Sequence, residues 1–146
     1  MGAVREMARV VRPGGVVTLM TPATLDAQPA WGPFVQVAAR HAGPEAVRLL
    51  STYWALGDPG ELTRLLVDAG LRVVATMTRE GTARFGSIDE MVTTEVESTP
   101  LAERLTPEVY RRIRSEAREA LHRFANPDGQ VALPLIGHIV GARRIR

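Results

Sequence analysis

The stretch Arg5–Thr21 constrains the fold more than any other part of the chain, because it holds a helix end, a stop and a strand in one run. In its first half, apolar side chains recur at helical spacing, with arginines and a glutamate on the other face. Pro13 cannot continue a helix, and Gly14-Gly15 permit the positive φ that commonly ends one. Val16–Met20 is then a short apolar run without clean alternation. Such a run is typical of a strand covered on both faces by helices, so the stretch predicts an α/β fold.

A second run, from Gly57 to Thr78, repeats the order of helix, glycine and strand. Asp58 has the position of an N-cap, Pro59 that of the first helical residue, and Gly70 that of the stop. The helix should pack on the sheet through the leucines of its apolar stripe, Leu62, Leu65 and Leu66. The strand is expected over Leu71–Thr78, with Leu71, Val73, Ala75 and Met77 on one face.

The other periodic segments predict a largely helical remainder and one more strand. Helices are expected over Phe34–His41, Glu45–Trp54 and Pro107–Phe124, with a polar, proline-bearing loop over residues 21–32. Ser87 and Glu90 form a capping box. It opens a helix whose inner residues should be Ile88, Met91, Val92 and Val96. The end of the chain, after the turn at residues 126–129, is extended, with a final strand over His138–Ala142.

Residues 6–15, with the sequence EMARVVRPGG, carry a family resemblance. They resemble the helix and turn that follow the cofactor-binding half of class I S-adenosylmethionine (SAM)-dependent methyltransferases. Within that class, the resemblance is to the methyltransferase type 11 family. The family pattern there is roughly E-(apolar)-x-R-V-(apolar)-(R/K)-P-G-G, followed by an apolar strand. The resemblance continues with decreasing precision to the C-terminus, and it covers only the second half of the family's domain.

The resemblance implies a fold. It is a partial Rossmann-like methyltransferase sheet of about three strands, with covering helices, in a single partial domain over residues 1–146. In the family the last strand is antiparallel and inserts between the two strands before it. By resemblance, Ile139–Ala142 would lie between Val16–Met20 and Leu71–Met77. The helices of residues 87–125 would form the variable insertion that often covers the substrate.

The resemblance also implies a function, with one element absent. The family binds SAM with a G-x-G-x-G turn between a strand and a helix, together with an acidic residue that grips the ribose, and this sequence contains neither. We therefore expect the C-terminal portion of a SAM-dependent methyltransferase that acts on a small molecule. The chain alone is expected to be inactive, with no cofactor-binding residue and no measurable affinity for SAM. The alternative is a non-enzymatic relic that serves as a binding or dimerisation module. An in-frame G-x-G-x-G directly upstream of Met1 would decide for the first.

His138 is the candidate catalytic residue. If its strand runs antiparallel to Val16–Met20, its start lies beside the C-terminal edge of that strand, where open α/β sheets bind ligands. A histidine at that edge can act as a general base. The alternative is a structural histidine that is hydrogen-bonded at a strand end, and the sequence shows no partner acid at a fixed spacing.

Six further residues are candidates for substrate binding. Four are aromatic and flank the loop and helices that leave the ligand-binding edge, and two directly follow the first strand; they are Trp31, Phe34, Tyr53, Trp54, Thr21 and Pro22. The aromatic side chains could line a pocket for an apolar or aromatic substrate. The alternative is that they pack the helices onto the sheet.

Composition excludes several classes of site. There is no cysteine, so disulfides, thiolate metal sites and cysteine nucleophiles are excluded, and no metal site is expected. All eighteen basic residues are arginine, the net charge is only +2, and the arginines over Tyr110–Arg123 are mixed with glutamates. These observations favour a solvated surface over a nucleic-acid partner. No apolar run approaches a membrane span or a signal peptide, so we expect a cytoplasmic protein without a membrane partner.

The strand Val16–Met20 predicts a protein partner. In the family fold this strand has a neighbour on each side, and the chain supplies only one of them. The other edge would present unpaired N–H and C=O groups, and the strand offers no charge, proline or bulge to blunt it. We therefore expect the chain to form a homodimer through this edge, to pair with a missing N-terminal half, or to aggregate.

Overall fold

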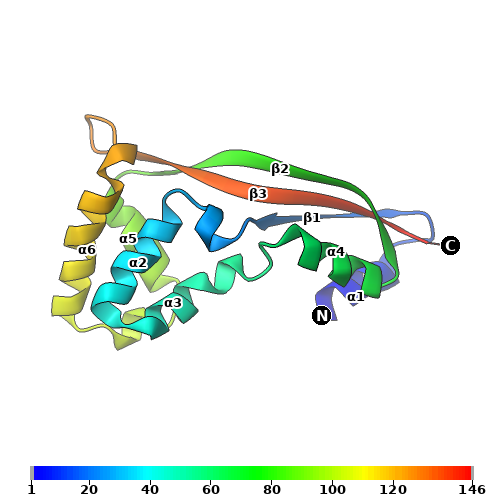
Figure 1. The fold of residues 1–146 in the computed structure, drawn as a ribbon, viewed down its shortest axis with the longest axis horizontal. Helices are drawn as coiled ribbons and strands as arrows, with labels where there is room; N and C mark the ends of the chain where they lie inside the picture. Colours follow the sequence, from blue (N-terminus) through cyan, green and yellow to red (C-terminus); the bar gives the residue numbers. More distant parts are fainter. Residues whose placement is uncertain (1, 146) are drawn as a thin grey trace. The chain divides into compact units, whose positions relative to one another are not determined.

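The computed structural model describes residues 2–145, which form six α-helices and three strands (Figure 1). Their order is α1 (Gly2–Val10), β1 (Val16–Pro22), α2 (Trp31–Ala42), α3 (Pro44–Leu50), α4 (Pro59–Asp68), β2 (Leu71–Phe85), α5 (Ile88–Glu97), α6 (Pro107–Leu121) and β3 (Val131–Arg144). The described residues divide into two compact units. Unit 1 contains residues up to Thr24, Trp54–Glu80 and the chain from Ile136; unit 2 contains Leu25–Tyr53 and Gly81–Leu135.

The three strands form one sheet in the order β1-β3-β2. Strand β3 is antiparallel to β1, with Val16 opposite Arg143 and Pro22 opposite Gly137. The last strand of the sequence therefore lies between the two earlier ones, which confirms the predicted order. The α/β class is confirmed as well. Strands β2 and β3 each contribute residues to both units.

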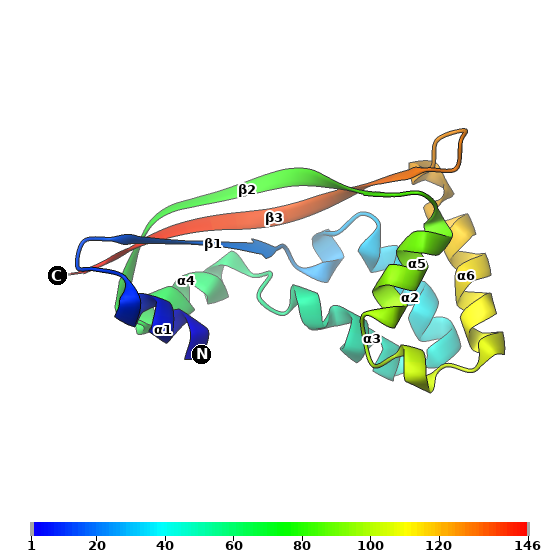
Figure 2. The ribbon, with the colours of Figure 1, turned by 180° about the vertical axis from the view of Figure 1, so that it is seen from behind.

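In unit 1, helices α1 and α4 lie on the same side of the strands (Figures 1 and 2). We call this side of the sheet the inner face. Its buried core consists of Ala8, Leu62, Leu66, Leu71, Val140 and Ala142. The partly buried side chains packed against this core are Val4, Val11, Val17, Leu19, Ala69 and Val73. Of the three predicted leucines, Leu62 and Leu66 are buried, whereas Leu65 is only half-buried.

The opposite, outer face of β1 is open, and here the expectation of a strand covered on both faces is wrong. Val16 is 49% exposed and Met20 is 78% exposed, while the alternate residues Val17 and Leu19 pack on the core. The physical reason is that both helices of unit 1 that pack on the sheet, α1 and α4, cover the inner face. The apolar run of β1 therefore has one face in the core and one in solvent.

Strand β2 is longer than predicted, and at one point along it the alternation of side chains between the two faces of the sheet shifts by one residue. A methyl group placed on Gly141 of β3 would lie 3.8 Å from Cγ2 of Val74 and 4.0 Å from Cβ of Ala75, so two residues of β2 meet one residue of β3. This is the arrangement of a β-bulge. Before the bulge, Leu71 and Val73 face the core, but after it the predicted face is not kept: Met77 is 42% exposed.

The predicted starts of α4, α5 and α6 are confirmed by their caps, whereas α2, predicted from Phe34, begins at Trp31 without a side-chain cap. The Glu61 N–H donates to Asp58 Oδ1 at 2.7 Å, the Glu90 N–H to Ser87 Oγ at 3.0 Å, and the Val109 N–H to Thr106 Oγ1 at 3.2 Å. Each cap satisfies a backbone donor that has no partner within its helix. Local sequence thus determines where α4, α5 and α6 begin.

Unit 2 consists of helices α2, α3, α5 and α6, together with the end of β2 from Gly81 and the start of β3 up to Leu135. Helices α2, α5 and α6 contact one another around a core that contains Phe34, Val37, Met91, Val96 and Ile113, all fully buried. All four inner residues predicted for α5 are buried. The predicted single domain with an insertion over residues 87–125 stays a prediction, and unit 2 is wider than that insertion because it also includes Leu25–Tyr53.

Among the described residues, no helix is long and apolar enough to cross a membrane.

Candidate functional site

Three polar side chains lie in a row across the sheet of unit 1, one from each strand. Thr21, near the end of β1, is opposite His138 of β3. On the other side of the ring, the hydroxyl of Thr78 in β2 lies 2.9 Å from His138 Nδ1. The row lies at the C-terminal end of β1, which is where His138 was predicted. Thr78 was not predicted, because its partner depends on strand register and on the bulge, which periodicity does not reveal.

His138 is buried, with 8% of its surface exposed. Its hydrogen bond with Thr78 fixes the ring plane, and the hydroxyl can donate to Nδ1 or accept from Nδ1–H according to the tautomer. Within residues 2–145 the structure gives the ring no other hydrogen bond and no carboxylate partner. Among the described residues, Nε2 is therefore the ring nitrogen without a hydrogen-bond partner.

Thr21 adds an unsatisfied group to the row. Its Oγ1 is buried and has no hydrogen-bond partner among the described residues. A buried hydroxyl without a partner costs about 1–3 kcal/mol, so a native fold usually keeps one for a reason. The site thus contains a buried imidazole and a buried hydroxyl on facing residues of neighbouring strands.

The chain that leaves β1 is held closely at this edge. The Ala23 N–H donates to the Ile136 carbonyl at 2.8 Å. Gly57 lies against the same segment, since a Cβ there would come within 2.3 Å of the Thr24 nitrogen. Only glycine fits such an approach of two backbones. Together these contacts fix the path of the residues directly after Thr21 and Pro22.

The predicted substrate-binding residues fall in different units. Thr21, Pro22 and Trp54 belong to unit 1, whereas Trp31, Phe34 and Tyr53 belong to unit 2. Trp31, Phe34 and Trp54 are buried, at 4%, 0% and 8% exposure, and Tyr53 is 51% exposed. Their role in substrate binding stays a prediction. Phe34 in particular has the burial expected of a core residue.

Unit 2 contains one acid that sequence reasoning missed. Trp31 donates its Nε1–H to Glu95 Oε1 at 2.9 Å. Burial raises the pKa of Glu95 above its ordinary value, and the hydrogen bond from Trp31 opposes that rise. No local pattern distinguishes Glu95 from the other glutamates of α5, so its burial becomes visible only when α2 is placed beside it.

The described residues do not fit SAM. A cofactor turn requires free N–H groups at a helix start that follows a strand, and the one direct strand-to-helix step among them is β2–Gly86–α5. There the Gly86 N–H donates to Glu90 Oε2 at 2.7 Å, and Ser87 Oγ accepts from the Glu90 N–H. A carboxylate of the chain itself therefore occupies the place of an anion. No group of three metal-ligating side chains occurs among residues 2–145 either.

Comparison with known proteins gives a likeness of fold. No family model matches the sequence, and no curated protein matches it. A candidate methyltransferase from Bacillus halodurans matches in structure with a TM-score of 0.49 and 14% identity, over 98% of this chain and 62% of that one. The YcgJ protein of Bacillus subtilis matches with a TM-score of 0.47 and 16% identity, over 99% of this chain and 57% of that one. This chain thus spans about 60% of the length of these two solved proteins.

Proposed function

We propose that this chain is the C-terminal portion of a SAM-dependent methyltransferase that acts on a small molecule. The observation that carries the proposal is the sheet order β1-β3-β2, with the last strand antiparallel between the other two. The resemblance of residues 6–15 to the methyltransferase helix and turn predicts this order from the sequence. A local motif and a long-range strand pairing are separate properties of a sequence, so their agreement supports the proposal more than either alone.

In the complete enzyme, SAM supplies an electrophilic methyl group, and residues outside this chain would hold it. The task assigned to this chain is to bind the substrate and accept its proton. His138 Nε2 would accept the proton of the small-molecule nucleophile, while Thr78 keeps the ring oriented through Nδ1. The Thr21 hydroxyl, buried and unpartnered among the described residues, would bind a polar group of the same substrate. These roles use the edge of the sheet at which open α/β folds bind ligands.

Calorimetric titration with SAM tests the proposal. The chain by itself should show no measurable binding, because it lacks the glycine turn and the ribose-binding acid. The chain extended by the in-frame coding sequence upstream of Met1 should bind SAM at micromolar concentration. Micromolar binding by the chain alone, or none by the extended protein, would contradict the proposal.

In the extended protein, His138→Gln should lower the rate of methyl transfer about 10²–10⁴-fold while SAM binding is unchanged. His122→Gln is the matched control, because His122 is exposed and bonds only to the Glu119 carbonyl in the described structure. Equal rates for the two variants would assign His138 a structural role.

The second candidate function is a binding or dimerisation module, and the open edge of β1 favours it. Among residues 2–145, strand β1 pairs only with β3, and its outer-face residues Val16 and Met20 are exposed. Such an edge and face are a template for another strand. Sedimentation at micromolar concentration tests this candidate, for which we expect a dimer. A stable monomer with slow amide exchange along β1 would contradict it.

A further inference from the structure

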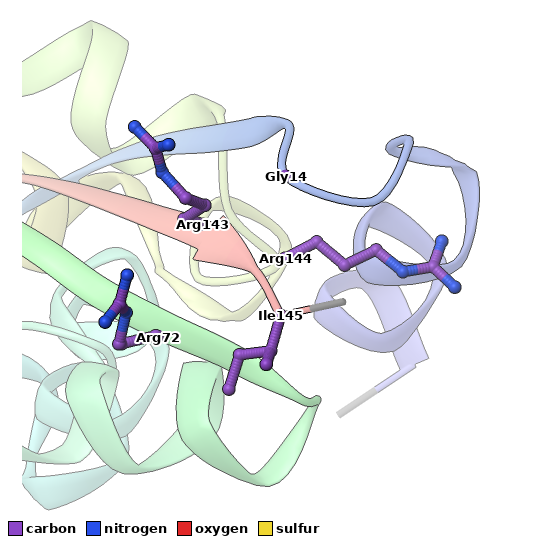
Figure 3. A pocket seen from close by; sticks show the side chains of 5 residues that line it. All are labelled: Gly14, Arg72, Arg143, Arg144 and Ile145. Carbon is purple, nitrogen blue, oxygen red and sulfur yellow. The ribbon is translucent and has the colours of Figure 1, made fainter.

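At the other end of the β1–β3 pair, unit 1 has a hollow of about 460 Å³. Its lining residues are Gly14, Arg72, Arg143, Arg144 and Ile145 (Figure 3). Three arginines therefore line one hollow, and none of its lining residues within the described part of the chain is acidic. The hollow is distinct from the histidine row: Val16 pairs with Arg143 and Thr21 with His138, so about five residues, or roughly 17 Å, of strand separate them.

The three arginines have different tasks. Arg144 lies toward α1, and its Nη1 donates to the carbonyls of Arg9 at 2.9 Å and Val11 at 2.7 Å. It thereby satisfies carbonyls at the C-terminal end of that helix, where a cation is favourable. Arg143 and Arg72 lie on the outer face, since each alternates with residues of the inner face. In Figure 3 their side chains extend to one side, away from that of Arg144.

Arg72 and Arg143 lack the acidic partners that several other arginines have. Arg9 pairs with Glu6, Arg112 with Glu108, and Arg118 with Asp89, each through N–O distances of 2.5 Å. Within residues 2–145, neither Arg72 nor Arg143 has an ion pair or a side-chain hydrogen bond, and both are exposed. Two like charges on neighbouring strands repel each other, and this repulsion is relieved when an anion lies between them.

We propose that Arg72 and Arg143 form a binding site for the phosphate group of a small phosphorylated molecule. Guanidinium groups form paired, charge-assisted hydrogen bonds with phosphate oxygens. The backbone N–H groups beside the hollow cannot help to bind the phosphate, because they are already hydrogen-bonded. The Gly14 N–H donates to the Arg144 carbonyl at 3.0 Å and the Gly15 N–H to the Arg12 carbonyl at 2.8 Å. Ile145, 61% exposed, and Val16, 49% exposed, provide apolar surface for the organic part of the molecule.

Calorimetry at constant ionic strength, set with sodium chloride, tests this site with inorganic phosphate and phenyl phosphate as probes. We expect both to bind, and phenyl phosphate to bind more tightly because its ring can contact Ile145 and Val16. The double variant Arg72→Gln, Arg143→Gln should weaken both at least tenfold. Arg111→Gln should leave both unchanged, since Arg111 is an exposed arginine of α6 outside the hollow. Arg144 is left in place because it caps α1.

Thermal melting in phosphate-free buffer shows whether the double variant folds. Its midpoint should equal or exceed that of the unchanged chain, because the substitutions remove a repulsion and no observed contact. Equal phosphate affinity in the double variant, or no binding by the unchanged chain, would overturn the proposal. So would a single-stranded oligonucleotide that binds more tightly than phenyl phosphate with a steep salt dependence, because the surface would then be a nucleic-acid site. None of these outcomes depends on methyltransferase activity.

Discussion

The two units of this protein differ in how completely they bury their apolar side chains. In unit 2, helices α2, α5 and α6 enclose Phe34, Met91 and Ile113, and each of these is 0% exposed. In unit 1, the sheet has helices on its inner face only, and its outer face presents Val16 and Met20 to solvent. The helices of unit 2 bury their apolar faces against one another, whereas an antiparallel strand pair such as β1–β3 can pack one face on a core and leave the other in solvent.

The difference also concerns charge. Unit 2 joins its helices by ion pairs between different elements, such as Arg40–Glu116 and Arg118–Asp89. Unit 1 has arginines near the end of its sheet that no described carboxylate pairs with, Arg72 and Arg143. Unit 2 therefore links its helices by ion pairs, whereas unit 1 presents an apolar face, an open edge and a basic hollow. Unit 1 is therefore the better place to look for a binding function.

The inner face of unit 1 should be as firmly packed as the core of unit 2. Leu66 is fully buried against Val140 and Ala142, so Leu66→Ala should lower the free energy of unfolding by about 2–5 kcal/mol. Urea unfolding followed by circular dichroism measures this loss.

Leu65→Ala is the matched control for that measurement. Leu65 is half-buried and lines a surface hollow with Glu61 and Arg64, so its loss should be under about 2 kcal/mol. Equal losses for the two variants would show that α4 is rotated about its axis relative to the described structure.

In unit 2, Glu95 should make stability depend on pH. Burial raises the folded-state pKa of this carboxyl above its unfolded value, so the folded state binds the proton more tightly. Stability should therefore fall as pH rises from the ordinary glutamate value through the raised pKa. Glu95→Gln keeps an acceptor for the Trp31 Nε1–H and should remove this slope, with a gain at pH 7 below about 1 kcal/mol.

Denaturant unfolding between pH 4 and pH 8 measures the Glu95 effect in the unchanged chain and the variant. Identical pH slopes would indicate that water reaches Glu95, and the contrast of a closed unit 2 with an open unit 1 would then weaken. Glu97→Gln is a suitable control, because Glu97 lies on the exposed side of the same helix.

The smallest effect is expected on the outer face. Met20 is 78% exposed in the strand, so Met20→Thr should change the free energy of unfolding by less than about 0.5 kcal/mol. The neighbouring change Leu19→Thr should cost distinctly more, because Leu19 packs on the core of the inner face. Calorimetric or urea unfolding of dilute protein compares the two. A cost above about 2 kcal/mol for Met20→Thr would mean that another surface covers the outer face in solution.

Much of the fold could be predicted from short-range sequence signals. The caps at Asp58, Ser87 and Thr106 and the leucine stripe of α4 follow from residues within one or two helical turns. The strand order required the family resemblance. The length of β2 could not be predicted, because most of its distal residues are polar and exposed. The extended end of the chain was predicted, but not that it forms one strand from Val131 to Arg144.

The candidate site was predicted in part. The position of His138 at the C-terminal edge of β1 followed from the antiparallel order, and the register places it opposite Thr21. Thr78 and Glu95 could not be identified, because each acquires its role from a partner 60 or more positions away in the sequence. Burial of Trp31 and Phe34 shows why aromatic residues beside a predicted loop are weak evidence for a pocket.

The bulge at Val74–Ala75 has a consequence for how this sheet tolerates length changes. Deleting one residue from a plain strand reverses the facing of every side chain beyond the deletion. Here two residues of β2 already oppose the single residue Gly141, so removal of Ala75 would leave one residue opposite one. Before the deletion, Leu71 and Val73 would still pack on the core. After it, Thr78 would still contact His138. The bulge is therefore the position in β2 at which a one-residue deletion during evolution would preserve the sheet.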